Sequence, residues 1–298
     1  MDLAHFGLTR RPFRPTPDTD AYYKAPTHEA ALAALRHAYE ARDGLALVDG
    51  EPGTGKTIIV RKFLDGLDPA VAPVFLPSPR FLRPTDLYQA ILFDHGTDYR
   101  GLSEQELRLL VTDHLLGRVS AGEPTVLVLD EAQGLGPDVL EELRLLGNIE
   151  TRAAKAAFIV LAAQLGLRER LAKPELAAFA QRVAVRCKIE PLSREDAGRF
   201  LHHQLEVAGG SASLLTDEAL NLLTEHAHGV PRILNQAAAL AFQLAGSAEA
   251  ENVDTEAAWE ALLQLGLATG ELDAEPVTPA KVRIGKPTKS RAAKRKAA

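Results

Sequence analysis

Short apolar runs alternate with helical stretches over the first two thirds of the chain. The runs at 45–49, 71–76, 126–129 and 158–162 lack the alternation of a half-exposed strand, so each predicts a strand buried on both faces. Helices are expected at 28–42, 56–64, 85–93 and 103–116, the last one opened by a capping box of Ser103 and Glu106. This order predicts an α/β fold, a doubly wound parallel sheet between helical layers.

The pattern changes after Pro191, where helices follow one another with no strand between them. Ser193 and Thr216 are expected to cap the first two helices, Pro231 suits the first turn of the third, and 255–265 predicts a fourth. We therefore expect a core with an N-terminal arm at 1–190, a helical domain at 191–268 and a disordered basic tail at 269–298.

Charge is unevenly spread along the 298 residues. The net charge is −6, but residues 281–298 hold eight basic and no acidic side chains, which leaves −14 on the rest. The single cysteine, Cys187, is compatible with a reducing compartment. Residues 1–14 lack the apolar segment of a signal peptide, and no apolar stretch reaches the roughly 18 residues of a membrane span. A cytoplasmic protein without a membrane span is expected.

One glycine-rich segment fits the phosphate-binding pattern G-x-x-x-x-G-K-[ST] completely, between an expected strand and an expected helix. Glycines let backbone N–H groups turn inward around phosphate oxygens, and the helix N-terminus adds partial positive charge. We expect Lys56 to reach the β- and γ-phosphates of ATP and Thr57 to place its hydroxyl on Mg²⁺. The expected cofactor-binding residues are Gly50, Glu51, Pro52, Gly53, Thr54, Gly55, Lys56 and Thr57.

Two further apolar runs end in polar residues. Asp130 closes the run at 126–129 and is expected to hold the Mg²⁺ shell, while Glu131 after it orients or deprotonates water. Gln164 follows the run at 158–162, where its amide is within reach of the γ-phosphate or the attacking water. A solvated loop after a strand is the plain alternative for Asp130 and Glu131, and the upstream phosphate-binding motif favours their catalytic interpretation. For Gln164 the alternative is a surface glutamine at a strand end.

Two arginines stand at element boundaries. Arg182 lies between a helix and an expected final strand, and Arg232 begins the third helix of the helical domain. An arginine that meets the transferring phosphoryl group accelerates its transfer by several orders of magnitude, and it can come from a neighbouring subunit. Position alone does not separate this role from that of a solvated surface arginine.

Together these residues resemble an AAA+ ATPase of the general secretion pathway protein A family over roughly residues 1–265. Beside the two nucleotide motifs, the resemblance is carried by Phe6-Gly7-Leu8, Pro12-Phe13, Pro17-Asp18, His28-Glu29-Ala30, Leu140-Glu141-Glu142-Leu143-Arg144-Leu145-Leu146, Arg168-Glu169-Arg170-Leu171, Pro191-Leu192-Ser193 and Gly229-Val230-Pro231-Arg232.

The resemblance implies a P-loop core, a helical lid, and a homo-oligomeric ring or filament with ATP and Mg²⁺ at the subunit contacts. It implies that Gln164 is the sensor-1 residue, that Arg232 is the sensor-2 residue and a further cofactor-binding residue, and that Arg182 is the arginine finger. Arg186 competes for the finger role because it lies close by in the same expected strand.

The end of the chain guides the functional interpretation. Secretion members of this family carry a transmembrane helix and a cell-wall-binding region after the ATPase, whereas residues 265–298 here are too polar to span a bilayer. Related transposition ATPases have a similar core without a membrane segment. We therefore expect an ATP hydrolase that acts on DNA, in transposition or a similar process, with a transposase as partner.

Two alternatives stay open. One is a secretion or envelope-assembly ATPase that works with a separately encoded membrane partner. The other is a nucleotide-binding scaffold with negligible turnover, against which the Asp130-Glu131 pair argues. The basic tail from Lys281 to Lys296 is expected to contact double-stranded DNA through its phosphates, and a merely solubilising terminus is the alternative.

Overall fold

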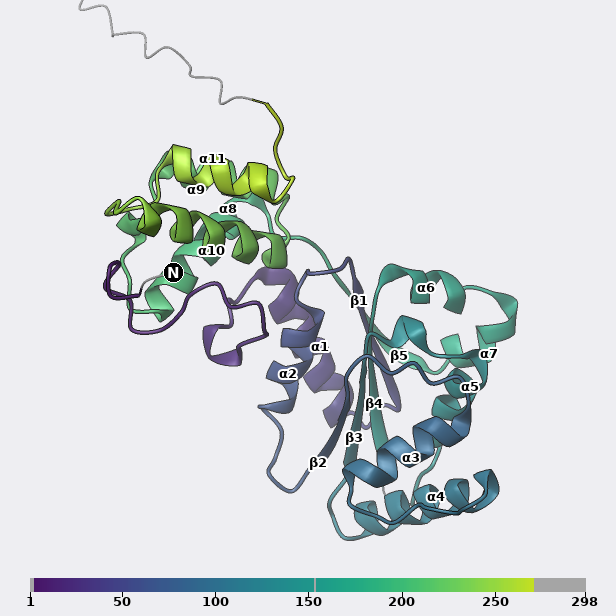
Figure 1. Ribbon diagram of the computed structural model, residues 1–298. Coiled ribbons are helices and arrows are strands. Elements are labelled where there is room, and N and C mark those ends of the chain that lie inside the picture. The colour runs from purple at the N-terminus through teal and green to yellow at the C-terminus, as the bar shows by residue number, and fades with distance from the viewer. Residues whose placement is uncertain (1–2, 153, 271–298) are drawn as a thin grey trace, which may run out of the picture. The chain divides into compact units, whose positions relative to one another are not determined.

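The computed structural model describes residues 3–152 and 154–270. Its strands form one sheet, parallel throughout, in the order β2-β3-β4-β1-β5 (Figure 1). Every residue of β1, β3 and β4 is buried, which confirms that three of the four apolar runs mark strands covered on both faces. The run at 71–76 forms β2 at the edge of the sheet, where Pro73 is exposed and Phe75 half-buried, so burial on both faces was wrong for this strand. The strands are β1 (Leu45–Gly50), β2 (Ala72–Leu76), β3 (Thr125–Asp130), β4 (Ala157–Ala163) and β5 (Val183–Ile189).

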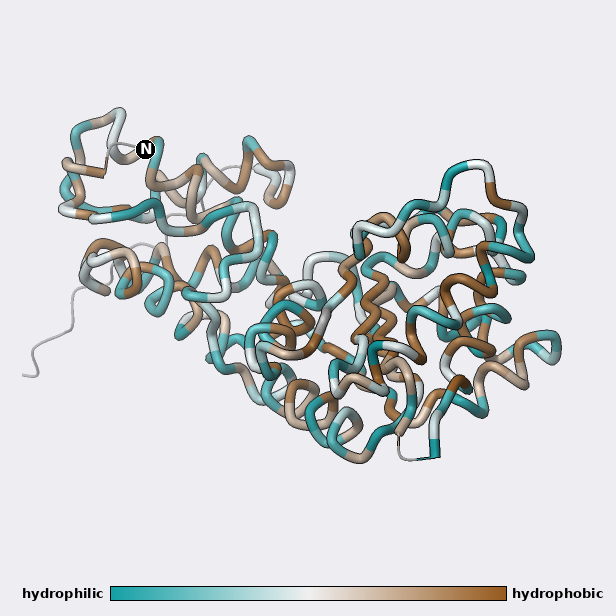
Figure 2. Tube along the Cα trace, turned by 90° about the horizontal axis from the view of Figure 1, so that it is seen from below, coloured by the Kyte–Doolittle hydropathy of each residue, from teal (hydrophilic) through white to brown (hydrophobic). Residues whose placement is uncertain are grey.

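Helices cover both faces of this sheet (Figure 1). One apolar cluster packs two helices against one face through side chains such as Leu35 and Phe63, and a second packs five against the other through Leu87 and Leu143. Figure 2 shows hydrophobic residues gathered along the central strands. The helices are α1 (Pro26–Glu40) and α2 (Lys56–Leu64) on the first face, and α3 (Pro84–Asp94), α4 (Glu104–Ser120), α5 (Pro137–Leu146), α6 (Leu165–Leu171) and α7 (Ala177–Ala180) on the second.

The predicted helices are present, with shifted ends. α1 begins at Pro26 because a proline in the first turn needs no N–H and has a helical φ. The capping box before α4 is confirmed, since the Ser103 hydroxyl accepts from the Glu106 N–H and the Glu106 carboxylate accepts from the Ser103 N–H. α4 continues to Ser120, beyond the expected end at 116.

A C-terminal cluster of helices follows the sheet, as predicted. Ser193 caps its first helix and Thr216 its second, each through the side-chain oxygen. The N-terminal arm adds Phe6 and Phe13 to this cluster, with ring centroids 5.1 and 5.5 Å from that of Phe242. Its helices are α8 (Arg194–Val207), α9 (Asp217–His226), α10 (Pro231–Ser247) and α11 (Thr255–Gln264).

The expected domain boundaries stay predictions. Contacts group Met1–Ala268 into one compact unit that contains both the sheet and the helical cluster. The basic tail lies outside the described residues from 271 onward. Within residues 3–152 and 154–270, every helix is too short or too polar to cross a lipid bilayer.

A pair of histidines joins α3 to α4. Nδ1 of His95 lies 2.6 Å from Nε2 of His114, so one ring donates a hydrogen bond to the other. Burial, followed by the charges of His114 and Arg118, lowers the pKa of His95 to about 4. Burial, followed by Arg118, also lowers the pKa of His114, and Asp113 opposes this shift. Both rings are therefore held neutral in the folded protein.

We expect these histidines to make the fold sensitive to acid. Below the ordinary histidine pKa of about 6.5, the unfolded chain binds protons that the folded chain does not. The free energy of unfolding therefore decreases as the pH is lowered. Urea unfolding of the wild type near pH 7 and near pH 5 measures this loss. His95→Gln should reduce the loss, whereas His37→Gln on the exposed face of α1 should leave it unchanged. An equal loss in wild type and His95→Gln contradicts the assignment.

Candidate nucleotide-binding site

The phosphate loop (residues 50–57) joins β1 to α2 at the carboxyl edge of the sheet. Gly53 and Gly55 take φ values of +82° and +103°, in the region that favours glycine. A Cβ on Gly53 would lie 2.9 Å from Cβ of Arg232, and one on Gly55 would lie 2.7 Å from Nε2 of His28. Both glycines are therefore required for the loop to take this shape under its neighbours.

Lys56 and Thr57 lie at the start of α2, as the motif predicts. Lys56 is buried, and its Nζ donates hydrogen bonds to the carbonyls of Gly50 at 3.1 Å and Glu51 at 2.8 Å. Burial lowers the pKa of its amine, an effect that the nearby carboxylates oppose. The Thr57 hydroxyl donates to Oδ2 of Asp130 at 2.7 Å, which joins the loop to the end of β3.

Glu131 and Gln164 meet beside this pair. Gln164 follows β4, the neighbour of β3, and its amide donates to Oε2 of Glu131 at 3.2 Å. Oδ1 of Asp130 accepts a hydrogen bond from the Glu131 N–H at 3.0 Å. Glu131 has a φ of +59°, which is uncommon for a residue with a side chain. The structure thus brings together Lys56, Thr57, Asp130, Glu131 and Gln164, although their chemical roles stay predictions.

Arg232 reaches the site from the helical cluster. It lies in the first turn of α10, and its N–H donates to the carbonyl of Gly53 at 3.2 Å. The segment before α10 is tied to the chain just before α8, because the N–H of Leu192 donates to the carbonyl of Gly229 at 2.8 Å. A Cβ on Gly229 would lie only 2.0 Å from the Leu192 carbonyl oxygen, so this close approach requires glycine. Arg232 thus lies beside the phosphate loop, and its sensor-2 role stays a prediction.

Arg182 and Arg186 lie away from the chain's own phosphate loop. Val183, directly after Arg182, pairs with Leu45 at the start of β1, whereas the loop begins at Gly50 at the end of that strand. Five strand residues span about 17 Å. Arg186 lies within β5, and its guanidinium donates to a main-chain carbonyl of α7 at 2.6 Å. Both arginines are exposed, and the finger role of either one stays a prediction.

A cavity of about 690 Å³ opens beside the phosphate loop. It is bordered by Lys56, Glu131, Arg232 of α10 and the N-terminal arm (residues 3–25). Pockets of roughly 300 to 1,000 Å³ hold small molecules and cofactors. The volume, the lysine and the glycine turn together suit a nucleotide.

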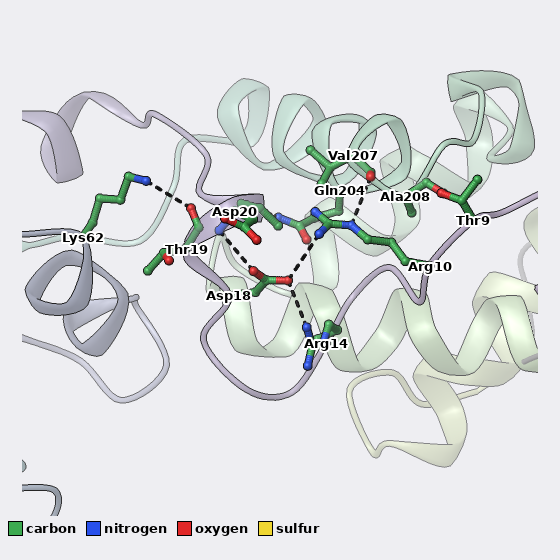
Figure 3. Close-up of polar contacts among 11 residues, drawn as sticks. Thr9, Arg10, Arg14, Asp18, Thr19, Asp20, Lys62, Gln204, Val207 and Ala208 are labelled. Atoms are coloured by element: carbon green, nitrogen blue, oxygen red, sulfur yellow. Dashed lines mark hydrogen bonds and ion pairs between the residues drawn. The ribbon is translucent and has the colours of Figure 1, made fainter. Parts of the chain in front are cut away.

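The N-terminal arm is hydrogen-bonded both to α2 and to the helical cluster (Figure 3). In the short turn η1 (Thr19–Ala21), the Thr19 carbonyl accepts from Lys62 of α2 at 3.3 Å and the Ala21 carbonyl accepts from Gln204 of α8 at 2.8 Å. Asp18 caps this turn through the Asp20 N–H at 3.1 Å. The helix that follows the phosphate loop is therefore linked to the helical cluster through the arm.

The same arm caps the end of α8 (Figure 3). The Thr9 hydroxyl donates to the Ala208 carbonyl at 3.0 Å, and Nε of Arg10 donates to the Val207 carbonyl at 3.1 Å. These carbonyls belong to the last turn of the helix, where the chain itself offers no intrahelical donors. The arm thereby fixes the end of α8.

Sequence reasoning missed the role of Asp49, the last side chain before the phosphate loop. Asp49 is completely buried and accepts hydrogen bonds from both Nε and Nη2 of Arg168, which lies on α6. A carboxylate inside a buried strand signals that a cationic partner is required. The sequence does not tell which arginine supplies it, although Arg168 belongs to a segment of the family resemblance.

Sequence reasoning also missed His28 and Gln133. Nε2 of His28 lies 2.9 Å from the Thr54 carbonyl of the phosphate loop, which orients the loop from α1. Burial lowers the pKa of His28, so the neutral ring donates this hydrogen bond. Gln133 contacts Glu131 from the turn after β3. Neither contact has a signal in residue spacing, because both depend on tertiary packing.

Comparison with known proteins identifies the nucleotide-binding part. Residues 39–171 match the family model described as an AAA domain. The chain contains an AAA domain. It is also 36% identical over 238 residues to General secretion pathway protein A from Aeromonas hydrophila, an alignment that covers 79% of this chain and 43% of that protein. The chain thus spans less than half the length of this curated relative.

Solved structures confirm the AAA+ fold. Cdc6p from Pyrobaculum aerophilum gives a TM-score of 0.70 at 18% identity, covering 89% of this chain and 71% of that one. The Aeropyrum pernix ORC1 protein in complex with DNA gives 0.64 at 22% identity, covering 84% and 68%. The Thermotoga maritima RuvB Holliday junction branch migration motor gives 0.57 at 17% identity, covering 83% and 73%. The predicted fold class, sheet and helical cluster alike, is therefore confirmed.

The residues of the AAA domain fit ATP and Mg²⁺. The phosphate loop cannot take side chains at Gly53 or Gly55, and its buried lysine lies against carbonyls that it can exchange for phosphate oxygens. Thr57 and Asp130 present neighbouring oxygens 2.7 Å apart, the ligand type that Mg²⁺ prefers. These residues would hold the triphosphate and its metal ion.

Proposed function

We propose that this chain binds ATP with Mg²⁺ and hydrolyses it as a secretion or envelope-assembly ATPase that works with a membrane-borne protein partner. The gathering of Lys56, Thr57, Asp130, Glu131 and Gln164 at one edge of the sheet carries the enzymatic part of the proposal. The 36% identity to General secretion pathway protein A supports the choice of process. On this proposal the chain works on the cytoplasmic side of the membrane.

The chemistry is divided among the site residues. Mg²⁺, when bound, would offset the negative charge of the phosphates. Lys56 binds phosphate oxygens, Thr57 and Asp130 hold the metal shell, and Glu131 orients the attacking water and accepts its proton. Gln164, whose amide reaches Glu131, senses the γ-phosphate, and Arg232 couples the helical cluster to the nucleotide.

The position of Arg182 and Arg186 favours assembly into a homo-oligomer. Neither side chain lies beside its own phosphate loop, so an arginine finger from this part of the chain acts on the nucleotide of a neighbouring subunit. ATP at such a contact stabilises the ring or filament, and hydrolysis weakens it. Arg182 is our first candidate, because the Arg186 guanidinium already binds a main-chain carbonyl.

The DNA-handling interpretation stays a prediction. Its main argument is the basic tail, which lies outside the described residues. That the similar ORC1 structure is in complex with DNA is a property of that protein, at 22% identity. The comparisons therefore favour the secretion alternative over transposition with a transposase partner.

Phosphate release by the full chain, measured with and without double-stranded DNA at several salt concentrations, tests the proposal. We expect Mg²⁺-dependent hydrolysis that DNA leaves unchanged, both in the full chain and in one lacking residues 281–298. Salt-sensitive stimulation by DNA, lost with the tail, would contradict the secretion role and support DNA handling. Absence of hydrolysis would contradict the enzymatic role.

A further inference from the structure

We propose that Gln133 is a positioning residue that holds one oxygen of the Glu131 carboxylate, so that the other oxygen faces the attacking water. The inference rests on the proposed ATP hydrolysis. Gln133 lies in the turn η2 (Ala132–Gly134), two residues after Glu131 and directly past the end of β3.

Both ends of the Gln133 amide are occupied. Its Oε1 accepts from the main-chain N–H of Gln164 at 3.1 Å, and its Nε2 donates to Oε2 of Glu131 at 2.6 Å. A backbone N–H can only donate, so the oxygen must face Gln164 and the nitrogen must face Glu131. The amide orientation is therefore set by the network.

The turn that carries Gln133 is itself fixed from α6. Nη1 of Arg170 donates to the Gln133 carbonyl at 2.8 Å, and Nη2 donates to the Leu135 carbonyl at 2.8 Å. Two residues earlier on α6, Arg168 holds the buried Asp49 near the end of β1. α6 thus ties the turn beside Glu131 to the strand that leads into the phosphate loop.

The arrangement leaves the two Glu131 oxygens in different environments. Oε2 accepts two amide hydrogen bonds, from Gln133 at 2.6 Å and from Gln164 at 3.2 Å. Within the described ranges 3–152 and 154–270, Oε1 accepts no recorded hydrogen bond, and Glu131 borders the cavity while Gln133 does not. An ionised carboxylate on a flexible side chain needs such support to act at a defined point.

Gln133→Met tests this role because methionine keeps the length of the side chain and removes the amide. The substitution removes the hydrogen bond from Gln133 to the charged Glu131 carboxylate. Because this carboxylate takes part in the reaction, kcat should fall about tenfold to a hundredfold. ATP affinity should stay at its wild-type value, since Gln133 does not border the cavity. Gln133→Glu should lower kcat further, because its carboxylate repels Glu131.

Two comparisons separate positioning from a structural effect. Gln105→Met, on the exposed face of α4, should keep the wild-type kcat. In a Glu131→Gln background, Gln133→Met should change the residual single-turnover rate by less than about twofold, because the group it positions is gone. The inference is wrong if Gln133→Met keeps the wild-type kcat, or if it lowers the rate equally in the Glu131→Gln background. Either result would leave the proposed function standing. Absence of turnover by the wild type would overturn the proposed function, and this inference with it.

Discussion

Replacing Lys56 with alanine should abolish measurable ATP binding. In the folded chain the Lys56 amine is buried and donates to two carbonyls of the phosphate loop, at 3.1 and 2.8 Å. With nucleotide bound, the same amine meets the β- and γ-phosphates, where each charge-assisted hydrogen bond is about twice as strong as a neutral one. Losing these contacts should weaken binding by at least about a hundredfold.

Isothermal titration of ATP with Mg²⁺ into both proteins measures this change. Lys173→Ala is the matched control, because Lys173 is an exposed lysine after α6. We expect the control to bind like the wild type. The assignment of the phosphate loop is wrong if Lys56→Ala retains wild-type affinity while its circular dichroism and melting temperature show an intact fold.

Replacing Glu131 with glutamine should stop turnover and leave binding intact. The amide keeps the size of the side chain but does not accept a proton, and general-base catalysis contributes about 10²- to 10⁴-fold to the rate. ATP binding depends on Lys56 and Thr57, so it should persist, and the ATP-bound oligomer should outlast that of the wild type. Steady-state phosphate release and light scattering in ATP measure the two effects.

Glu169→Gln provides the comparison for Glu131→Gln. Glu169 is exposed on α6, close in sequence to the arginines that support the site, and its loss should change neither turnover nor assembly. Normal steady-state hydrolysis by Glu131→Gln would refute the role given to that carboxylate. Rapid dissociation of its ATP-bound oligomer would refute the coupling between hydrolysis and assembly.

Local signals in the sequence were enough to predict the elements that carry the site. The apolar run ending in Asp130 predicts β3 because a strand covered on both faces needs no polar alternation. Ser103 and Glu106 predict the start of α4 because each satisfies an N–H of the other residue. The phosphate-loop motif predicts the shape of the turn between β1 and α2, because the positive φ values of Gly53 and Gly55 favour glycine at these positions.

Contacts between distant segments could not be predicted in this way. Spacing does not reveal that Arg168 binds Asp49, 119 positions away, because the pairing arises when α6 packs beside β1. The same holds for Gln133, whose amide joins Gln164 after β4 to Glu131 after β3. This contact forms only when β3 and β4 are paired. The position of Arg182 depends on the register between β5 and β1. This register places Arg182 near the start of β1, whereas the phosphate loop follows the end of β1.

Equilibrium binding of ATP to the full wild-type chain, with Mg²⁺ and then with EDTA, tests the central claim most directly. The account predicts saturable binding of ATP that weakens when Mg²⁺ is removed. In Thr57→Ala, binding should no longer depend on Mg²⁺, because the Thr57 hydroxyl and Asp130 lie together at the loop. A folded chain that binds no ATP in Mg²⁺, or binds it equally well in EDTA, would contradict the account.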